Sequence, residues 1–273
     1  MAKSKYPILL VHGMGFRDNK LLNYWGRIPK ILKDNGYEVY YGNQDANGSI
    51  ESNAQKLKNQ IEELIQKYKI EKFNVIAHSK GGLEIRYAIC NLKIENYIAS
   101  VTTINTPHNG SKTIDKIMKL PKFLIKFFSK ITDLWFRICG DKNPNTYQAL
   151  LSFQTQKARD FNLKNIDSPL IYYQSYAFIM KKASSDFIMF IPYLVVKKIE
   201  GENDGFLTPD SVKWGNFKGV YTSTTNRGIS HCDEVDFRRR KLSKKTPLNN
   251  YEISDMTNFY LDMVNDLVIN HGF

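Results

Sequence analysis

The stretch that decides the fold is FNVIAHSKGG, residues 73–82. Its first half is mostly apolar and predicts a buried strand, whereas the two glycines open a segment with helical spacing. Ser79 stands at the turn between the two. Because small residues at positions 77 and 81 let a strand and a helix approach closely, the pattern A-H-S-K-G predicts a tight strand–turn–helix elbow that raises the Ser79 hydroxyl above a sheet.

Strand and helix signals alternate on both sides of this elbow. Short apolar or alternating runs predict strands, and apolar residues at every third or fourth position predict helices. The expected strands are residues 6–11, 37–41, 73–77 and 97–104, and the expected helices are residues 20–35, 49–68 and 80–92. This order predicts an α/β fold with a mostly parallel central sheet and helices on both of its faces.

Residues 112–165 interrupt the alternation with a helical stretch. Its bulky apolar residues occupy more than one helical face, and lysines are interleaved among them. A strand signal resumes at residues 169–178, so we expect a single domain over residues 1–273 with a helical insertion at about 112–165. The insertion is either a fixed cap or a mobile lid whose apolar face meets lipid while its lysines meet headgroups.

Composition narrows the class of protein. Hydrophobic residues make up 42% of the 273 residues and aromatic residues 13%, enough for a sizeable core. The longest apolar run, residues 187–196, is about half the length that spans a bilayer. The segment before the first strand lacks a signal-peptide pattern, which predicts a cytoplasmic protein; a secreted form whose leader has been removed is the alternative.

The formal net charge of +12 favours contact with anionic surfaces. The basic residues are dispersed along the chain, and no recognised nucleic-acid motif is present. We therefore expect no nucleic-acid partner. The three cysteines show no metal-ligand spacing and imply no disulfide framework.

A serine nucleophile needs a base, and the base needs an orienting acid. Of the five histidines, His231 lies late in the chain in a polar loop, where the order serine, acid, histidine places the base. Asp204, in the turn GENDGF, lies between Ser79 and His231. On local grounds alone Asp204 is little better as the acid than Glu202 or Asp210.

Two backbone amides are candidates for binding an oxyanion. The turn His12-Gly13-Met14-Gly15 follows the first strand and can present the amide of Met14, and the amide of Lys80 opens the elbow helix. The competing interpretation of this turn is an ordinary glycine-rich loop. A dinucleotide or Walker loop is excluded, because the third glycine and the G-K-[ST] motif are missing.

Five segments, in this order, carry a family resemblance: YPILLVHGMGFRD, VIAHSKGG, INTPHNGS, ENDG and ISHCDEVD. They resemble the bacterial true lipases (triacylglycerol lipases and esterases) of the α/β-hydrolase superfamily, the Pseudomonas–Burkholderia group and its Gram-positive relatives. The resemblance is strongest over residues 6–111 and 200–237. It implies Ser79 as nucleophile, Asp204 as acid, His231 as base, and hydrolysis of carboxylic esters of acylglycerols under a lid.

The resemblance also bears on metal binding. The chemistry it implies requires no cofactor, but several of these lipases bind a structural calcium ion with an aspartate two residues after the catalytic histidine. Asp233 holds that position, and Asp186 is the nearest candidate for a second aspartate. The alternative is that both aspartates are solvated or salt-bridged.

Two departures from the family pattern affect the elbow. Ala77 replaces the usual glycine at little cost. Lys80 stands where the group usually has His, Gln or Met. Its ammonium would favour anionic substrates or lower the pKa of the base, unless its side chain points to solvent.

Three functions remain open from the sequence. The leading one is a lipase or carboxylesterase that acts on lipid esters and touches a membrane or lipid-droplet surface transiently through the lid. The same three residues would equally serve an acyltransferase, an amidase or a phospholipase. The third is a non-catalytic basic lipid-binding protein.

Overall fold

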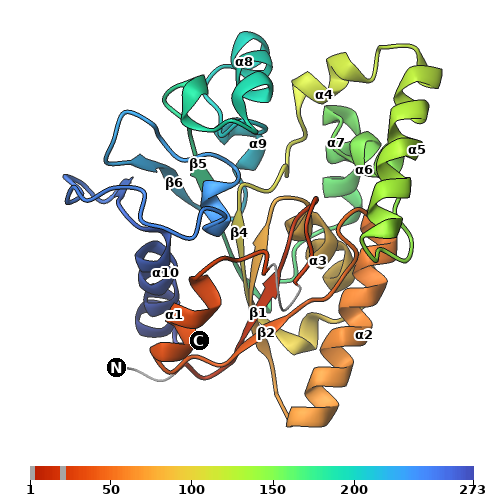
Figure 1. The fold of residues 1–273 in the computed structure, drawn as a ribbon. Helices are drawn as coiled ribbons and strands as arrows, with labels where there is room; N and C mark the ends of the chain where they lie inside the picture. The colour runs from red at the N-terminus through yellow and green to blue at the C-terminus, as the bar shows by residue number, and fades with distance from the viewer. Residues whose placement is uncertain (1–3, 19–22) are drawn as a thin grey trace.

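The computed structural model describes residues 4–18 and 23–273. Seven strands form one sheet in the order β2-β1-β3-β4-β5-β6-β7, and every neighbouring pair is parallel. Helices cover both faces of this sheet (Figure 1). The expected α/β fold with a parallel central sheet is therefore confirmed.

The elements follow one another in a β–α alternation that a helical segment interrupts after β4. The strands are β1 (Ile8–Val11), β2 (Val39–Tyr41), β3 (Phe73–His78), β4 (Ile98–Ile104), β5 (Tyr172–Phe178), β6 (Asn216–Ser223) and β7 (Glu252–Ile253). The helices are α1 (Ile28–Asp34), α2 (Ile50–Tyr68), α3 (Lys80–Asn91), α4 (Lys112–Ile117), α5 (Lys122–Ile138), α6 (Thr146–Ser152), α7 (Thr155–Lys164), α8 (Phe190–Ile199), α9 (Pro209–Val212) and α10 (Met256–His271). None of the helices in the described part of the chain combines the length and the apolar composition of a membrane span.

The central strands are buried on both faces, and apolar residues supply most of β1 and β3. Successive side chains of a strand point to opposite faces. In β1, Ile8 and Leu10 pack into the core under α1 and α10, whereas Leu9 and Val11 pack into the core under α2 and α3. The two cores hold the elbow strand β3 in place from both sides.

One expected helix is shorter than its pattern predicts. The helix expected over residues 20–35 appears as α1, Ile28–Asp34, and residues 19–22 lie outside the described part. Gly26 has a φ of 53°, a left-handed conformation that does not continue an α-helix. Pro29, whose fixed φ suits a first helical turn, lies at the new start of the helix.

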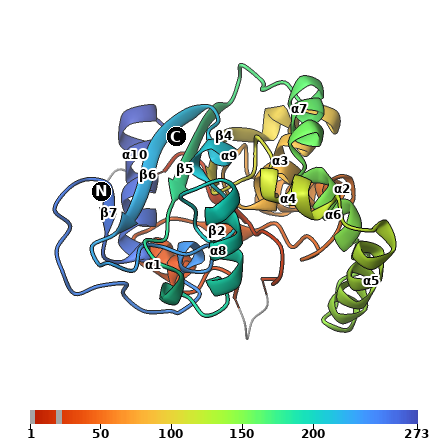
Figure 2. The same cartoon turned by 90° about the horizontal axis from the view of Figure 1, so that it is seen from above.

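The strands of a parallel sheet all end at the same edge, and this edge carries the candidate site. Helices α4–α7 lie between β4 and β5 in the chain and stand beside this edge together with α8 (Figure 1). Seen from above, α5 extends away from the rest of the molecule next to α6 (Figure 2). The strand order also divides the sheet into β1–β4 and β5–β7, which meet where β4 pairs with β5.

Candidate active site

Ser79 occupies a strained turn between β3 and α3. Its φ of 53° and ψ of −130° lie outside the regions that non-glycine residues ordinarily adopt. The turn needs glycine nearby: a Cβ at position 81 would lie 2.5 Å from the carbonyl oxygen of His12. A Cβ at Gly13 would lie 2.7 Å from Cβ of Ser79. The chain therefore packs the elbow against the loop after β1 as closely as a backbone permits.

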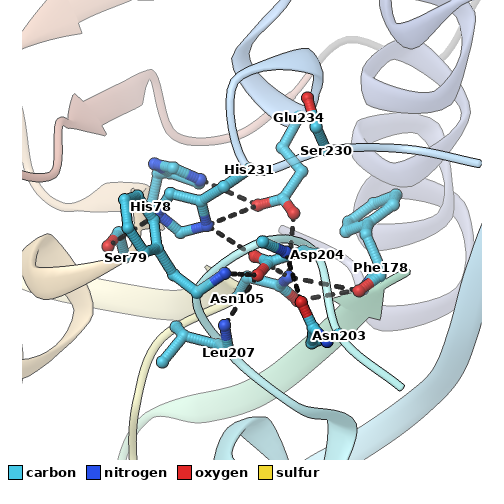
Figure 3. A network of polar contacts seen from close by, with 12 residues as sticks. His78, Ser79, Asn105, Phe178, Asn203, Asp204, Leu207, Ser230, His231 and Glu234 are labelled. Atoms are coloured by element: carbon cyan, nitrogen blue, oxygen red, sulfur yellow. Dashed lines mark hydrogen bonds and ion pairs between the residues drawn. The ribbon is translucent and has the colours of Figure 1, made fainter. Parts of the chain in front are cut away.

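Three side chains from separate loops converge at this turn. Nε2 of His231 lies 3.0 Å from Oγ of Ser79, and Nδ1 of His231 lies 2.6 Å from Oδ2 of Asp204 (Figure 3). The backbone N–H of His231 also donates to the carbonyl oxygen of Asp204 at 2.8 Å. Serine, histidine and carboxylate thus form a continuous hydrogen-bonded chain, the arrangement in which a histidine removes a proton from a serine.

Asp204 is fully buried and kept charged by its donors. Its Oδ1 accepts hydrogen bonds from the amides of Phe206 and Leu207, each at 2.7 Å, and Asn105 donates to Oδ2 at 2.5 Å. Burial alone would raise the pKa of Asp204, but the charge and hydrogen bond of His231 and these amides lower it to about 2. Neither Glu202 nor Asp210, the other acids considered, is buried.

A second carboxyl group, which the sequence did not single out, lies beside the first. Oε2 of Glu234 is 3.6 Å from Nδ1 of His231 and 2.8 Å from Nε2 of His78, and Asn105 donates to its Oε1 at 2.8 Å (Figure 3). Burial and the charge of Asp204 raise the pKa of Glu234 well above its usual range. The charge of Asp204 therefore disfavours a second negative charge on Glu234.

His78 closes this network on its far side. Its Nδ1 lies 2.6 Å from the hydroxyl of Tyr24. Burial and the charge of His231 lower the pKa of His78 well below its usual value, so this ring is neutral. Within the described residues, His78, His231 and Glu234 are the one group of three or more side chains with metal-ligating atoms this close together. Their mutual contacts already account for the grouping.

The two expected oxyanion donors follow residues at the serine: Met14 follows Gly13, which packs against Ser79, and Lys80 follows Ser79 itself. Loop residue His12 is fully buried and bonded through Nδ1 to the carbonyl oxygen of Gly13 at 2.8 Å, which fixes the turn that leads to Met14. Lys80 opens α3, and the first amides of a helix have no partner within it. In the described part of the chain, neither the amide of Met14 nor that of Lys80 donates to another protein group.

The Lys80 side chain neither reaches solvent nor faces a substrate. It is fully buried, donates from Nζ to the carbonyl oxygen of Gly48 at 2.8 Å and forms an ion pair with Glu84, one turn later in α3. Glu84 also accepts from Asn53 at 2.7 Å. The expectation of an ammonium acting on substrate or base was wrong, because a buried carboxylate that the sequence pattern did not reveal takes up its charge.

The insertion exposes an apolar surface. In α5 the buried residues are Ile125 and Ser129, and large apolar side chains of the helix are exposed; we call them the α5 stripe. The α5 stripe consists of Phe123, Leu124, Phe127, Phe128, Ile131, Leu134, Trp135 and Ile138. A second exposed apolar group, the α8 patch, consists of Phe187, Ile188, Phe190, Ile191, Leu194 and Val195.

Hydrogen bonds hold the insertion at defined points. Asp133 of α5 accepts from the amide and hydroxyl of Thr146 at 2.7 and 2.6 Å. Asp141, after α5, accepts from the amides of Ala46 and Asn47 at 2.9 and 2.8 Å. These contacts fix the end of α5 to α6 and to the loop before α2.

Asp186 and Asp233 come together, but a guanidinium lies between them. Arg238 approaches Oδ2 of Asp186 at 3.2 Å and Oδ1 of Asp233 at 2.8 Å. Calcium prefers six to eight oxygen ligands, whereas here a fixed cation is already paired with both carboxylates. The residues present do not fit the calcium site that the resemblance implied.

Comparison with known proteins identifies a family and several relatives of this chain. The model of the palmitoyl protein thioesterase family matches residues 7–159. Triacylglycerol lipase 2 of Saccharomyces cerevisiae is 32% identical over 272 residues, covering 92% of this chain and 76% of that protein. A triacylglycerol lipase of Vibrio cholerae is 36% identical over 116 residues, covering 42% of this chain and only 36% of that protein.

Solved structures share the fold. The lipase of Staphylococcus hyicus superposes with a TM-score of 0.69 at 19% identity, over 99% of this chain and 97% of that one. A metagenomic carboxyl esterase superposes with a TM-score of 0.70 at 15% identity, over 99% of this chain and 78% of that one. At identities this low, the structural similarity shows only the fold. The family assignment rests on the family model and on the yeast relative.

Proposed function

The chain belongs to the α/β-hydrolase family of triacylglycerol lipases and palmitoyl protein thioesterases, and from this premise we propose that it hydrolyses acyl esters of lipids through an acyl-enzyme on Ser79. The observation that carries the proposal is the hydrogen-bonded chain from Ser79 through His231 to Asp204. The yeast relative, named a triacylglycerol lipase, supports acylglycerols as the substrate class.

The reaction follows from the positions of the three side chains. His231 accepts the Ser79 proton at Nε2 while Oγ attacks the ester carbonyl, and the amides of Met14 and Lys80 bind the resulting oxyanion. The tetrahedral intermediate collapses, the C–O bond to the alcohol breaks, and His231 returns its proton to the leaving oxygen. Water then repeats the sequence on the acyl-enzyme and releases the fatty acid.

Each neighbour has a defined part in this scheme. Asp204, with its pKa of about 2, stays charged at neutral pH and stabilises the imidazolium that forms on His231. Each oxyanion amide contributes on the order of 3 kcal/mol to stabilising the transition state. No step requires a metal ion or an organic cofactor.

The exposed apolar side chains support contact between the protein and the surface of its lipid substrate. The α5 stripe and the α8 patch stand on the side of the sheet where the strands end, and Lys122, Lys126 and Lys130 alternate with the apolar residues of α5. Apolar side chains flanked by lysines suit the boundary between acyl chains and anionic headgroups. We therefore propose transient contact with a membrane or lipid-droplet surface.

A second candidate rests on the family model itself. A palmitoyl thioester would form the same acyl-enzyme on Ser79 and differ only in its thiolate leaving group, and the family model is named for this substrate. Acyltransferase, amidase and phospholipase activities would use the same three residues. The substrate panel described next separates these possibilities.

The decisive experiment compares the wild type with Ser79→Ala. Both are assayed on 4-nitrophenyl esters of two to sixteen carbons, emulsified triacylglycerol, palmitoyl thioester, phospholipid and acyl amide, with alcohol acceptors added in parallel. We expect long-chain ester hydrolysis that falls by at least about 10⁴-fold in Ser79→Ala. A basic lipid-binding protein would show vesicle binding without serine-dependent turnover, and a preference for alcohol over water would indicate an acyltransferase.

We also propose that the protein is cytoplasmic. Cys90, Cys139 and Cys232 are free thiols, which fits a reducing cytoplasm. Fractionation of the native host, with detection of the protein in the cytosolic or the extracellular fraction, tests this proposal.

A further inference from the structure

The cluster around Arg238 joins two parts of the molecule that carry the site. Asp186 follows β5, and Asp233 lies two residues after His231; both carboxylates are almost completely buried. Besides its two ion pairs, Arg238 donates from Nη2 to the carbonyl oxygen of Ser185 at 2.7 Å. One guanidinium thus bridges the connection after β5 and the loop of the catalytic base.

Ser230 connects both carboxylates to the loop of the catalytic base. Its hydroxyl donates to Oδ2 of Asp186 at 2.6 Å, and its amide donates to Oδ2 of Asp233 at 3.3 Å. The amide of Asp233 donates back to the Ser230 hydroxyl at 3.2 Å. Because Ser230 directly precedes His231, both carboxylates help to position the backbone that holds the imidazole.

The charges identify what kind of group this pair of carboxylates needs. Burying two carboxylates together is costly unless a cation compensates them. Among the described residues, Oδ1 of Asp233 receives no directed hydrogen bond, although Nε of Arg238 lies 2.8 Å away. That oxygen is held by charge alone.

We propose that the guanidinium of Arg238 takes the place of a divalent cation between Asp186 and Asp233, so that an internal side chain holds the His231 loop without calcium. Arginine suits this place because its planar, permanently charged fork can engage two carboxylates and a carbonyl together. Removing the guanidinium leaves two buried carboxylates with an unsatisfied oxygen, a set of hard ligands that calcium favours.

The test measures stability, so it does not depend on the proposed esterase activity. Thermal unfolding of the wild type, Arg238→Ala and Arg240→Ala is recorded in EGTA and in 5 mM CaCl₂, with MgCl₂ as a separate control. We expect no calcium-dependent shift in the wild type or in Arg240→Ala, whose exposed arginine lies two residues from Arg238. Arg238→Ala should unfold about 5 °C or more lower in EGTA and recover part of the loss in CaCl₂.

Direct titration of CaCl₂ by calorimetry gives the second measurement. Heat of binding is expected with Arg238→Ala and absent with the wild type. Arg238→Gln, which keeps the aliphatic part of the side chain and a polar end without the charge, should show the same calcium response and serves if the alanine variant does not accumulate. A wild type that binds calcium or loses stability in EGTA would overturn the proposal. So would destabilised Arg238 variants that ignore calcium, because the carboxylates would then form an ordinary ion-pair cluster.

Discussion

The carboxyl edge of the sheet and helix α5 use their side chains in opposite ways. Around Ser79 the polar groups are buried and paired: Asp204 is inaccessible to solvent and bonded on both oxygens. On α5 the large apolar groups are left in solvent, and Phe123 and Ile138 are 71% and 73% exposed. The sheet edge pairs its polar groups within the protein, whereas α5 leaves large apolar side chains in contact with water.

The difference separates two requirements of the proposed chemistry. Proton transfer needs donors and acceptors held within a few tenths of an ångström, which buried, fully bonded groups provide. Contact with a lipid surface needs apolar area that is free until the surface arrives. Substitutions at the sheet edge should therefore change the reaction or the stability of the fold, whereas substitutions on the α5 stripe should change only the response to the state of the substrate.

The largest effect is expected from Asp204→Asn. An amide cannot stabilise the imidazolium of His231 and favours the wrong tautomer, so kcat/KM on a soluble ester should fall by about 10³–10⁴-fold. The matched control is Glu202→Gln, at an exposed acid two residues earlier, which should leave kcat/KM unchanged. A loss below tenfold would contradict this assignment and indicate that Glu234, 3.6 Å from Nδ1 of His231, serves as the acid.

The next effect concerns stability. Lys80→Met removes one partner of a buried ion pair and should lower the free energy of unfolding by about 3–5 kcal/mol at pH 8. Lys30→Met, at an exposed pair with the same spacing on α1, should cost less than about 0.5 kcal/mol. Urea unfolding of both variants gives the comparison, and similar losses would contradict the importance of burial.

The Lys80→Met loss should also depend on pH. Burial raises the pKa of Glu84 even beside Lys80, and without the lysine the carboxyl binds its proton more readily. A raised carboxyl pKa favours the folded state below the unfolded pKa and penalises it as pH rises. The variant should therefore lie closer to the wild type at pH 5 than at pH 8.

On α5 we expect a smaller and more selective effect. The double substitution Phe128→Ser/Trp135→Ser removes two exposed aromatic rings, which would each gain on the order of 1–2 kcal/mol on burial in lipid. Hydrolysis of emulsified substrate should fall about tenfold, while turnover of a soluble short ester and the Tm should stay unchanged. Leu163→Ser, at a 78% exposed residue of α7, is the control. Equal losses on both substrates would mean that α5 acts as a fixed wall of the active site.

The last prediction concerns Glu234, whose pKa is raised by burial and by the charge of Asp204. A carboxyl with a raised pKa binds more protons in the fold than in the unfolded chain above its ordinary pKa, so wild-type stability should fall with rising pH. Glu234→Gln removes this proton uptake. Its free energy of unfolding should therefore gain on that of the wild type between pH 5 and pH 8 in urea titrations. Parallel pH dependences would show that Glu234 is charged in both states.

How far the sequence alone could predict this molecule depends on the range of the contacts. The elbow around Ser79 is coded within ten residues, whereas Asp204 and His231 are assigned from the chain order serine, acid, histidine together with the family resemblance. The partners that set their charge states do not follow from any local pattern. Asn105 and Glu234 reach the site from different loops, and only folding lets the Asn105 amide donate to both Asp204 and Glu234.

The same limit applies to two groups of charged residues. Lys80 carries its partner one helical turn away at Glu84, but nothing in the pattern shows that both are buried. Asp186 and Asp233 match a metal pattern in the chain, yet Arg238 decides what they hold. Local pattern predicted where charged groups would stand, and tertiary packing determined which of them would pair.

The three catalytic side chains are divided between two halves of the sheet, which meet where β4 pairs with β5. Strands β1–β4 bring the serine and strands β5–β7 bring the acid and the base, so proton transfer crosses from one half to the other. A protease that cut the connection after α7, where Ile166 and Leu170 are exposed, would yield one fragment with a nucleophile and no base, and another with a base and no nucleophile. Neither fragment alone would hold the complete set of Ser79, Asp204 and His231. Ester hydrolysis by the mixed fragments would therefore report that the two halves of the sheet had reassembled.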